Sequence, residues 1–249
     1  MNTGRAAALG EGGVADAGGT VGEVAVDHLV VAARTLADGV AWCEATFGMA
    51  PEPGGEHEWM GTHNRLLNIA SERFPRAYLE IIAINPLART PQRKRWFDLD
   101  QPALQNAIAA GPSLIHWVAR CNNARAASAA LRAAGIERGE LVPAQRQTPT
   151  GLLHWQITVR DDGQRLFAGA LPTLIEWGGV HPTDTLPNRG VALTRLAVNG
   201  LPTVFVPWLP STIEPTSAAN DRALRVTLAT RRGPVVLNSL EISPDHVQP

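Results

Sequence analysis

The chain has 249 residues, long enough to bury the core of one large domain or two small ones. Hydrophobic residues make up 45% and charged residues 18%, as in ordinary globular proteins, and no apolar run approaches the roughly 20 residues of a membrane helix. The formal net charge of −1 gives no reason to expect nucleic acid or an anionic membrane as a partner. We therefore predict no nucleic-acid or membrane partner.

Residues 1–22 are rich in glycine and alanine and lack the apolar stretch of a signal peptide, so we predict a flexible leader there. Cys43 and Cys121 are the only cysteines, and no Cys-x-x-Cys spacing occurs. These features favour a cytoplasmic protein without disulfides.

Residues 23–90 predict a first module of strand, helix, strand or loop, strand, strand. A β-rich run over residues 24–33 precedes a helix over 35–48, with Thr35 as its N-cap and Gly48 as its stop. After a loop rich in glycine and proline, two more strands are predicted over residues 63–70 and 77–84. A linker at 91–112 contains a predicted helix over 98–111.

Residues 113–187 repeat this pattern as a second module. A strand over 113–120 precedes a helix over 122–135, with Asn122 or Asn123 as its cap and Gly135 as its stop. Later strands are predicted over 151–160 and 173–179. Both modules thus consist of strand, helix, strand or loop, strand, strand. The remaining residues, 188–249, form an extension with runs over 190–200, 203–210, 222–230 and 233–242. One interpretation of this extension is a degenerate third module.

The first predicted strand of each module carries a histidine, and the last carries a glutamate: His28 and Glu80, then His116 and Glu176. An ionisable group on a mostly apolar strand face is costly to bury unless it is paired or bound to a metal. Imidazole and carboxylate together suit a divalent transition metal. A structural interpretation stays open, in which His28 is a hydrogen-bonded core histidine and Glu80 pairs with Arg65 or Arg76.

Four segments, "DHLVVAA", "GTHNRLL", "YLEIIA" and "LIEWGGVHP", resemble the vicinal oxygen chelate superfamily, which groups glyoxalases, bleomycin-resistance proteins and dihydroxybiphenyl dioxygenases. The resemblance spans roughly residues 24–185 and is narrower to the glyoxalase-like domain branch. It implies an α+β fold in which paired βαβββ modules form a curved, partly open barrel-like sheet, here with a C-terminal αβ extension. It also implies that the first and fourth strands of each module are neighbours and that their His and Glu side chains face one cavity.

The same resemblance makes His28, Glu80 and His116 the predicted ligands of a divalent metal (Zn, Fe, Mn or Ni), and it implies no nucleotide cofactor. His63 and Glu176 are candidates for moving a proton, since an imidazole titrating near neutrality suits that task. Substrate-binding candidates are His57, Asn64, His154 and Trp155. His181 is expected to shape the turn before Pro182, and tryptophans such as Trp59 and Trp177 form core or line an apolar pocket.

The leading hypothesis is a small-molecule enzyme whose metal chelates two adjacent substrate oxygens, of isomerase, lyase or dioxygenase type. One alternative is a metal-free protein of the same fold that binds or sequesters a small molecule. A third is a structural or interaction role for the extension, supported only by "FVPW" at 205–208. A homodimer is a further hypothesis, based on relatives and on apolar segments such as residues 203–210.

Overall fold

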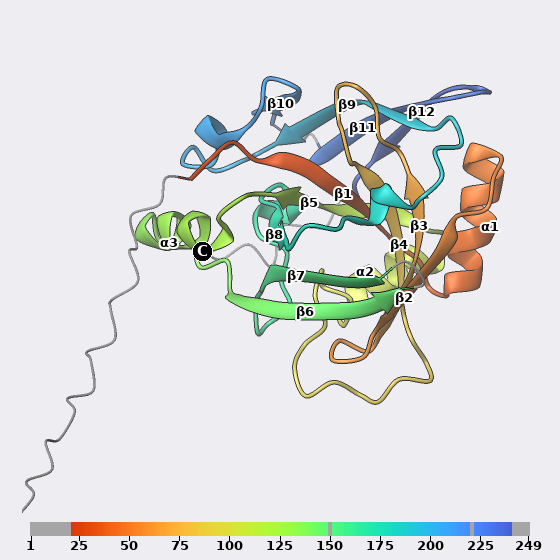
Figure 1. The fold of residues 1–249 in the computed structure, drawn as a ribbon, viewed down its shortest axis with the longest axis horizontal. Coiled ribbons are helices and arrows are strands. Elements are labelled where there is room, and N and C mark those ends of the chain that lie inside the picture. Colours follow the sequence, from red (N-terminus) through yellow and green to blue (C-terminus); the bar gives the residue numbers. More distant parts are fainter. Residues whose placement is uncertain (1–20, 149–150, 220–221, 241–249) are drawn as a thin grey trace, which may run out of the picture.

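The structure is a computed structural model that describes residues 21–148, 151–219 and 222–240 (Figure 1). The predicted leader, residues 1–22, therefore lies almost wholly outside the described residues.

The first half of the chain folds as β1 (Ala25–Ala32), α1 (Leu36–Phe47), β2 (Glu52–His57), β3 (Thr62–Asn68) and β4 (Tyr78–Ile84). The side chain of Thr35 accepts a hydrogen bond from the Asp38 amide and so caps α1, as its sequence predicts. Gly48 ends the helix in the left-handed region, at φ +77°, which a residue with a side chain adopts rarely. The strand β2 lies at the position that was predicted as either strand or loop.

The second half has the same order of elements: β5 (Ser113–Arg120), α3 (Ala124–Ala133), β6 (Glu140–Thr148), β7 (Gly151–Val159) and β8 (Thr173–Trp177). Asn123 caps α3 by accepting a hydrogen bond from the Ala126 amide. Between the halves lies α2 (Pro102–Ala109), shorter than the helix predicted over 98–111 because it begins at a proline. Two 3₁₀ turns, η1 (Phe167–Gly169) and η2 (Pro182–Asp184), flank β8.

These eight strands form one sheet in the order β2-β3-β4-β1-β5-β8-β7-β6. The first and fourth strands of each half pair in parallel, β1 with β4 and β5 with β8, and the halves join through antiparallel β1 and β5. The sheet curves so that β2 and β6, its two edges, approach each other (Figure 1). The predicted α+β class, with paired βαβββ modules in a curved sheet, is confirmed.

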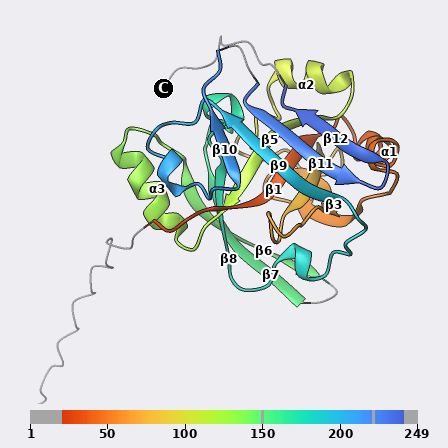
Figure 2. The ribbon, with the colours of Figure 1, turned by 90° about the horizontal axis from the view of Figure 1, so that it is seen from above.

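The extension forms a second sheet from β9 (Ala192–Asn199), β10 (Ile213–Thr216), β11 (Leu224–Thr230) and β12 (Gly233–Asn238), in the order β10-β9-β11-β12. The run over 203–210 forms only a 3₁₀ turn, η3 (Val206–Trp208), and the described residues of the extension contain no α-helix. Seen from above, this second sheet lies across β1 and β5 (Figure 2).

Side chains alternate across the central strands and so divide the interior into two cores. On the outer face, residues such as Leu29, Val31 and Trp117 pack with α1, α3 and the second sheet. On the inner, concave face, Val30 and Ile115 pack with α2 and with the linker before it. Within the described residues, no helix combines the length and apolarity that crossing a bilayer requires. The concave face is where the predicted site residues on β1 and β4 meet.

Candidate functional site

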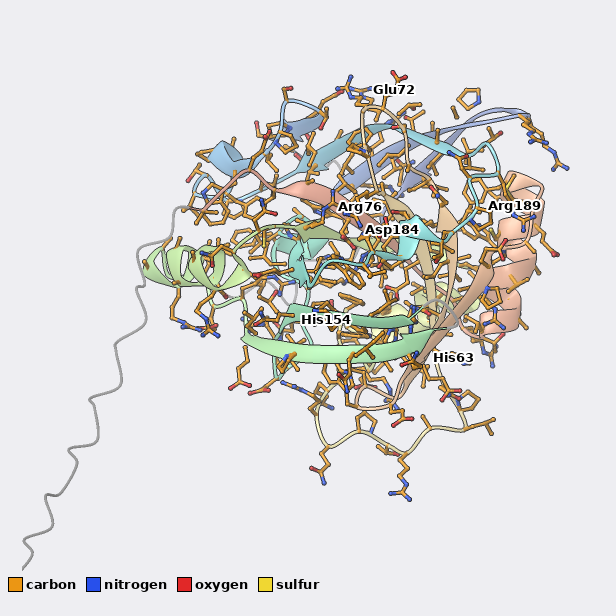
Figure 3. All side chains as sticks on the ribbon, viewed as in Figure 1. His63, Glu72, Arg76, His154, Asp184 and Arg189 are labelled. Carbon is orange, nitrogen blue, oxygen red and sulfur yellow. The ribbon has the colours of Figure 1, made fainter. Side chains whose placement is uncertain are left out.

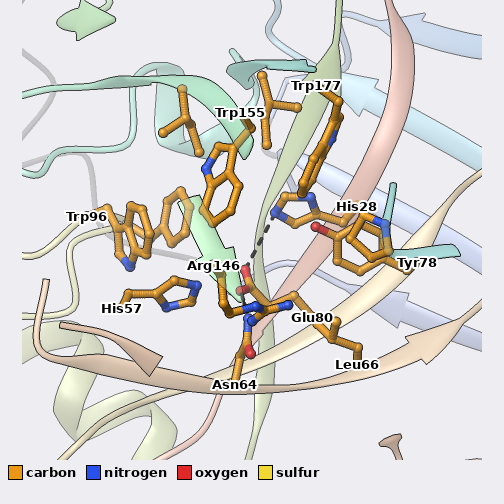
Figure 4. A pocket seen from close by; sticks show the side chains of 14 residues that line it. His28, His57, Asn64, Leu66, Tyr78, Glu80, Trp96, Arg146, Trp155 and Trp177 are labelled. Carbon is orange, nitrogen blue, oxygen red and sulfur yellow. Dashed lines mark hydrogen bonds and ion pairs between the residues drawn. The ribbon is translucent and has the colours of Figure 1, made fainter. Parts of the chain in front are cut away.

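The concave face of the large sheet contains a small cavity of about 40 Å³, partly open to solvent, whose lining comes from both halves and from the linker (Figure 4). The lining residues are His28, His57, Asn64, Leu66, Tyr78, Glu80, Trp96, Phe97, Arg146, Trp155, Ile157, Ile175, Trp177 and Pro182.

A buried chain of charged groups, Asp27–His28–Glu80, reaches this cavity. His28 Nδ1 lies 2.7 Å from Asp27 Oδ1, and His28 Nε2 lies 3.5 Å from Glu80 Oε2. All three residues are at most 5% exposed. Neighbours on a regular strand point to opposite faces, but the register of β1 against β5 shifts between Val26 and His28, and this irregularity brings the Asp27 carboxylate beside the His28 ring.

The carboxylate of Asp27 contacts two further hydrogen-bonding side chains. Trp177 Nε1 donates to Asp27 Oδ2 at 2.9 Å, and His181 Nε2 lies 3.1 Å from the same oxygen. His181 Nδ1 accepts from the Thr183 amide, which assigns its proton to Nε2. Although burial disfavours the charged form, the hydrogen bonds from His181 and His28 hold the pKa of Asp27 well below its usual range. His181 therefore shapes its turn, as predicted, and also orients Asp27.

His28 and Glu80 form a charged pair. Burial alone would lower the pKa of His28, but its contacts with Asp27 and Glu80 raise that pKa to about 9. Burial likewise opposes ionisation of Glu80, yet the His28 imidazolium and the Asn64 amide lower the pKa of Glu80 to about 2. At neutral pH the cavity therefore presents an imidazolium and a carboxylate. Their 3.5 Å separation is too long for a strong hydrogen bond, so both retain capacity for a ligand.

Asn64 fixes the other oxygen of Glu80. Its Nδ2 donates to Glu80 Oε1 at 2.6 Å, and its Oδ1 accepts from the Gly55 amide at 2.8 Å. Gly54 makes this packing possible, because a Cβ there would overlap Asn64 Oδ1 and lie 2.5 Å from the Asn64 carbonyl oxygen. The predicted substrate-binding residue Asn64 thus lies in the cavity, where it orients Glu80.

Aromatic side chains form the walls of the cavity. Tyr78 stacks on His28 with ring centroids 4.6 Å apart, and Trp155 and Trp177 lie together at 5.3 Å. His57 contacts the edge of Trp96 and pairs through Nδ1 with Thr62 Oγ1 at 3.1 Å. Burial lowers the pKa of His57 to about 4, so this ring is neutral at physiological pH. His57 and Trp155 are therefore brought to the same cavity as His28 and Glu80.

Three other candidates do not line this cavity. His63 alternates with Asn64 on β3 and is turned to the opposite face (Figure 3). His154 alternates with Trp155 on β7 and lies outside, packed on Gly178. Glu176 accepts a hydrogen bond from the Ala124 amide at 2.9 Å, at the start of α3 on the outer face. The structure therefore does not place the two proton-transfer candidates, His63 and Glu176, near His28.

His116 lies on the inner face but is fully buried, and both ring nitrogens are used by the protein. Nδ1 lies 3.2 Å from the Gly169 carbonyl oxygen, and Nε2 accepts from the Thr173 amide at 3.1 Å. The register explains why no carboxylate is beside it. Glu80 stands opposite Val30, two residues after His28, and the equivalent position opposite Val118 holds Thr173.

A catalytic zinc site typically has three protein ligands and an open position. His28 and Glu80 face each other, but the nitrogens of His116 are engaged elsewhere. Among the described residues, no group of three or more His, Cys, Asp or Glu side chains could hold a metal ion. The cationic side chain of Arg146 also lines the cavity. The residues present do not fit a resident divalent metal.

Two charged site residues, Asp27 and Arg146, were missed by sequence reasoning. Asp27 had a usable signal, since a carboxylate between valines and a histidine in an apolar strand needs a partner. Arg146 had none, because Pro143 and the polar residues around it made β6 resemble a loop. The structural alternative for Glu80, a pair with Arg76, is not present, since Arg76 pairs with Asp184 instead (Figure 3).

The chain is similar to known proteins mainly in fold. A protein of unassigned function from Staphylococcus aureus has 12% sequence identity and a TM-score of 0.54, over 88% of this chain and 87% of that one. Methylmalonyl-CoA epimerase from Streptomyces coelicolor, solved with 2-nitronate-propionyl-CoA, has 16% identity and a TM-score of 0.39, over 65% and 99%. The Mycobacterium tuberculosis epimerase has 16% identity and a TM-score of 0.37, over 61% and 86%.

No curated protein matches the chain. A family model described as "Glyoxalase-like domain" matches residues 26–210, a span that includes both βαβββ modules and the first strand of the extension. This match confirms the resemblance predicted from the sequence. The protein belongs to the glyoxalase-like domain family.

Proposed function

We propose that the protein is a small-molecule enzyme that removes a proton from a carbon next to a carbonyl group, in an isomerase or lyase reaction. The observation that carries this proposal is the buried pair of Glu80 and His28, which faces an aromatic cavity in its charged form. A base and a hydrogen-bond donor on neighbouring strands are what enolate chemistry requires.

In the proposed step, the Glu80 carboxylate takes the proton, and the C–H electron pair becomes the C=C bond of an enolate. The His28 imidazolium donates a hydrogen bond from Nε2 to the enolate oxygen as negative charge develops there. Return of the proton to another carbon or face gives an isomer, and loss of a leaving group gives a lyase product. The aromatic walls keep water from the reacting groups, which strengthens both contacts.

Positioning residues support this assignment of roles. Asn64 holds Glu80 Oε1, which leaves Oε2 for the substrate proton. Asp27 holds the Nδ1 side of His28, so that the Nε2 side is directed to Glu80 and the cavity. The same arrangement of carboxylate and histidine is common around metals, but among the described residues no third ligand joins His28 and Glu80.

Exchange of the substrate proton with D₂O tests the proposal without knowledge of the product. Wild-type protein, incubated in D₂O with a panel of 2-oxo and 2-hydroxy carbonyl compounds, should cause the α-proton NMR signal of at least one compound to decay. Glu80→Gln should slow this decay by about 10²- to 10⁴-fold, the range expected for loss of a general base. His63→Gln, on the opposite face of β3, should leave it unchanged.

A second candidate, metal-free binding or sequestration, is favoured by the tryptophan walls of the same cavity. It predicts that compounds bind without exchange. The enzyme proposal is wrong if two results occur together: panel compounds quench tryptophan fluorescence, and their α-proton NMR signals decay at the background rate with both wild type and Glu80→Gln. The binding role would then stand.

A further inference from the structure

We infer that Arg146 binds a carboxylate group of the ligand, so that the substrate class is small carbonyl acids carrying an apolar part. This inference rests on the proposed function and names the substrate of the same cavity. Arg146 lies on β6, in the second half of the chain. Its side chain reaches the cavity that is also lined by Glu80 and His28 (Figure 4).

The guanidinium of Arg146 has no partner within the described residues. Its Nε is buried without a hydrogen bond, and no ion pair or side-chain hydrogen bond engages the rest of the group. Four other arginines also have a buried nitrogen without a partner, but each of them has a carboxylate nearby: Arg76, Arg93, Arg95 and Arg120. Arg146 differs from them because its positive charge is left uncompensated.

A buried donor without an acceptor is unfavourable, so such a group persists where a ligand completes it. The only carboxylate that lines the cavity, among the described residues, is Glu80, and it is already paired with His28 and Asn64. A ligand oxyanion is therefore the missing acceptor. The planar, forked guanidinium suits a carboxylate, which it binds through two parallel hydrogen bonds.

The opposite edge strand makes room for this side chain. A Cβ on Gly55, in β2, would overlap the guanidinium of Arg146 and lie 2.6 Å from its Cδ. The two glycines of β2 thus leave space for different side chains: Gly54 for Asn64 and Gly55 for Arg146. Arg146 bridges the open side of the curved sheet at the cavity.

The remaining walls indicate what else the ligand carries. Trp155, Trp177 and Ile175 provide apolar surface, and the Glu80–His28 pair provides the reacting groups. With its carboxylate on Arg146, a small acid can present a carbonyl to His28 and its apolar part to the tryptophans. A guanidinium also binds phosphate groups. The test therefore compares carboxylate ligands with phosphonate ligands.

The test measures binding rather than turnover, and it uses the full chain carrying Glu80→Gln so that no chemistry intervenes. Quenching of tryptophan fluorescence is titrated with matched sets of probes: 2-oxo acids with short aliphatic or aromatic side chains, their methyl esters, and the corresponding phosphonates. We expect the acids to bind at least tenfold more tightly than their esters, and more tightly than the phosphonates.

Adding Arg146→Gln should weaken binding of the acids by about 10- to 100-fold, as expected for loss of one charged hydrogen-bonding partner, and should leave the esters unchanged. Arg146→Lys should retain part of the preference. Arg225→Gln, which changes an exposed arginine on β11, is the matched control and should have no effect.

Equal binding of acids and esters to the Glu80→Gln protein would overturn the inference, as would a preference for acids that survives Arg146→Gln. Tighter binding of the phosphonates would overturn the carboxylate assignment. If Arg146→Gln does not fold, Arg146→Lys replaces it, and an acid preference that Arg146→Lys leaves undiminished would overturn the inference. Failure of the proposed chemistry has a different signature, since acids would then bind through Arg146 without proton exchange in the wild type.

Discussion

Asp27 determines the charge of the reacting pair although it does not line the cavity. Its contact with Nδ1 of His28 helps to keep the imidazole protonated, against the effect of burial. Three further groups fix the Asp27 carboxylate: the indole of Trp177, the ring of His181 and the guanidinium of Arg120. The charge on His28 thus depends on residues from β1, β5, β8 and the segment after β8.

The raised pKa of His28 predicts how stability changes at alkaline pH. A group whose pKa is higher in the folded state than its ordinary 6.5 stabilises the fold fully below pH 6.5, and that contribution is lost as pH rises through about 9. At about 1.4 kcal/mol for each pKa unit, the contribution is at most about 3 kcal/mol. Urea unfolding between pH 6 and pH 10 should therefore show a steeper alkaline loss for wild type than for His28→Gln. Parallel curves for the two proteins would contradict the assignment.

At the scale of elements, the site depends on the edge strand β2. Its glycine pair allows Asn64 and Arg146 to pack against the strand, and Asn64 in turn holds Glu80. A local change in β2 should therefore affect a carboxylate that belongs to β4.

Gly54→Ala tests this link. The new methyl group would overlap Asn64, including its backbone, and such overpacking costs about 1–3 kcal/mol. We expect the free energy of unfolding to fall by that amount and proton exchange to slow by at least tenfold, as Glu80 loses its hydrogen bond. The control is Gly22→Ala, where a Cβ meets nothing within 4 Å. Exchange at the wild-type rate in Gly54→Ala would show that Asn64 does not position Glu80.

The elements with clear periodicity and caps could be predicted from the sequence, including β5 at its observed bounds and α1 between Thr35 and Gly48. The strands β2 and β6 could not, because glycines and prolines weaken the strand pattern of an edge strand. The meeting of His28 and Glu80 followed from the family resemblance, which made β1 and β4 neighbours. Glu176 looked equivalent to Glu80 by order along the chain, but the register gives that position to Thr173.

At the scale of the whole molecule, the two halves share a topology but contribute different chemistry. The first half supplies Asp27, His28 and Glu80, and the second supplies Arg146 and the tryptophan wall. In the second half, His116 and Thr173 occupy the places of His28 and Glu80 as uncharged, hydrogen-bonded core residues. Burial and the charges of Arg138 and Arg165 lower the pKa of His116, which keeps its ring neutral.

The extension completes this architecture by covering the outer face of the large sheet. Residues such as Leu196, Leu224 and Val226 are fully buried there with Leu29 and Val31 of β1. The outer side of β1, the strand that carries His28, packs against the second sheet, and its inner side packs in the core around the cavity. We expect the extension to act through the rigidity of β1, since no residue of its strands lines the cavity.

The most direct test of the central claim, acid–base chemistry by Glu80 and His28 without a resident metal, is α-proton exchange by chelator-treated protein. Wild type should exchange the α-proton of a 2-oxo acid at the same rate before and after treatment and removal of the chelator, with no stoichiometric transition metal in the purified protein. Glu80→Gln should slow the exchange by about 10²- to 10⁴-fold. Loss of exchange on treatment, with recovery on adding Zn²⁺, Fe²⁺, Mn²⁺ or Ni²⁺, would contradict the account and restore the metal-dependent hypothesis.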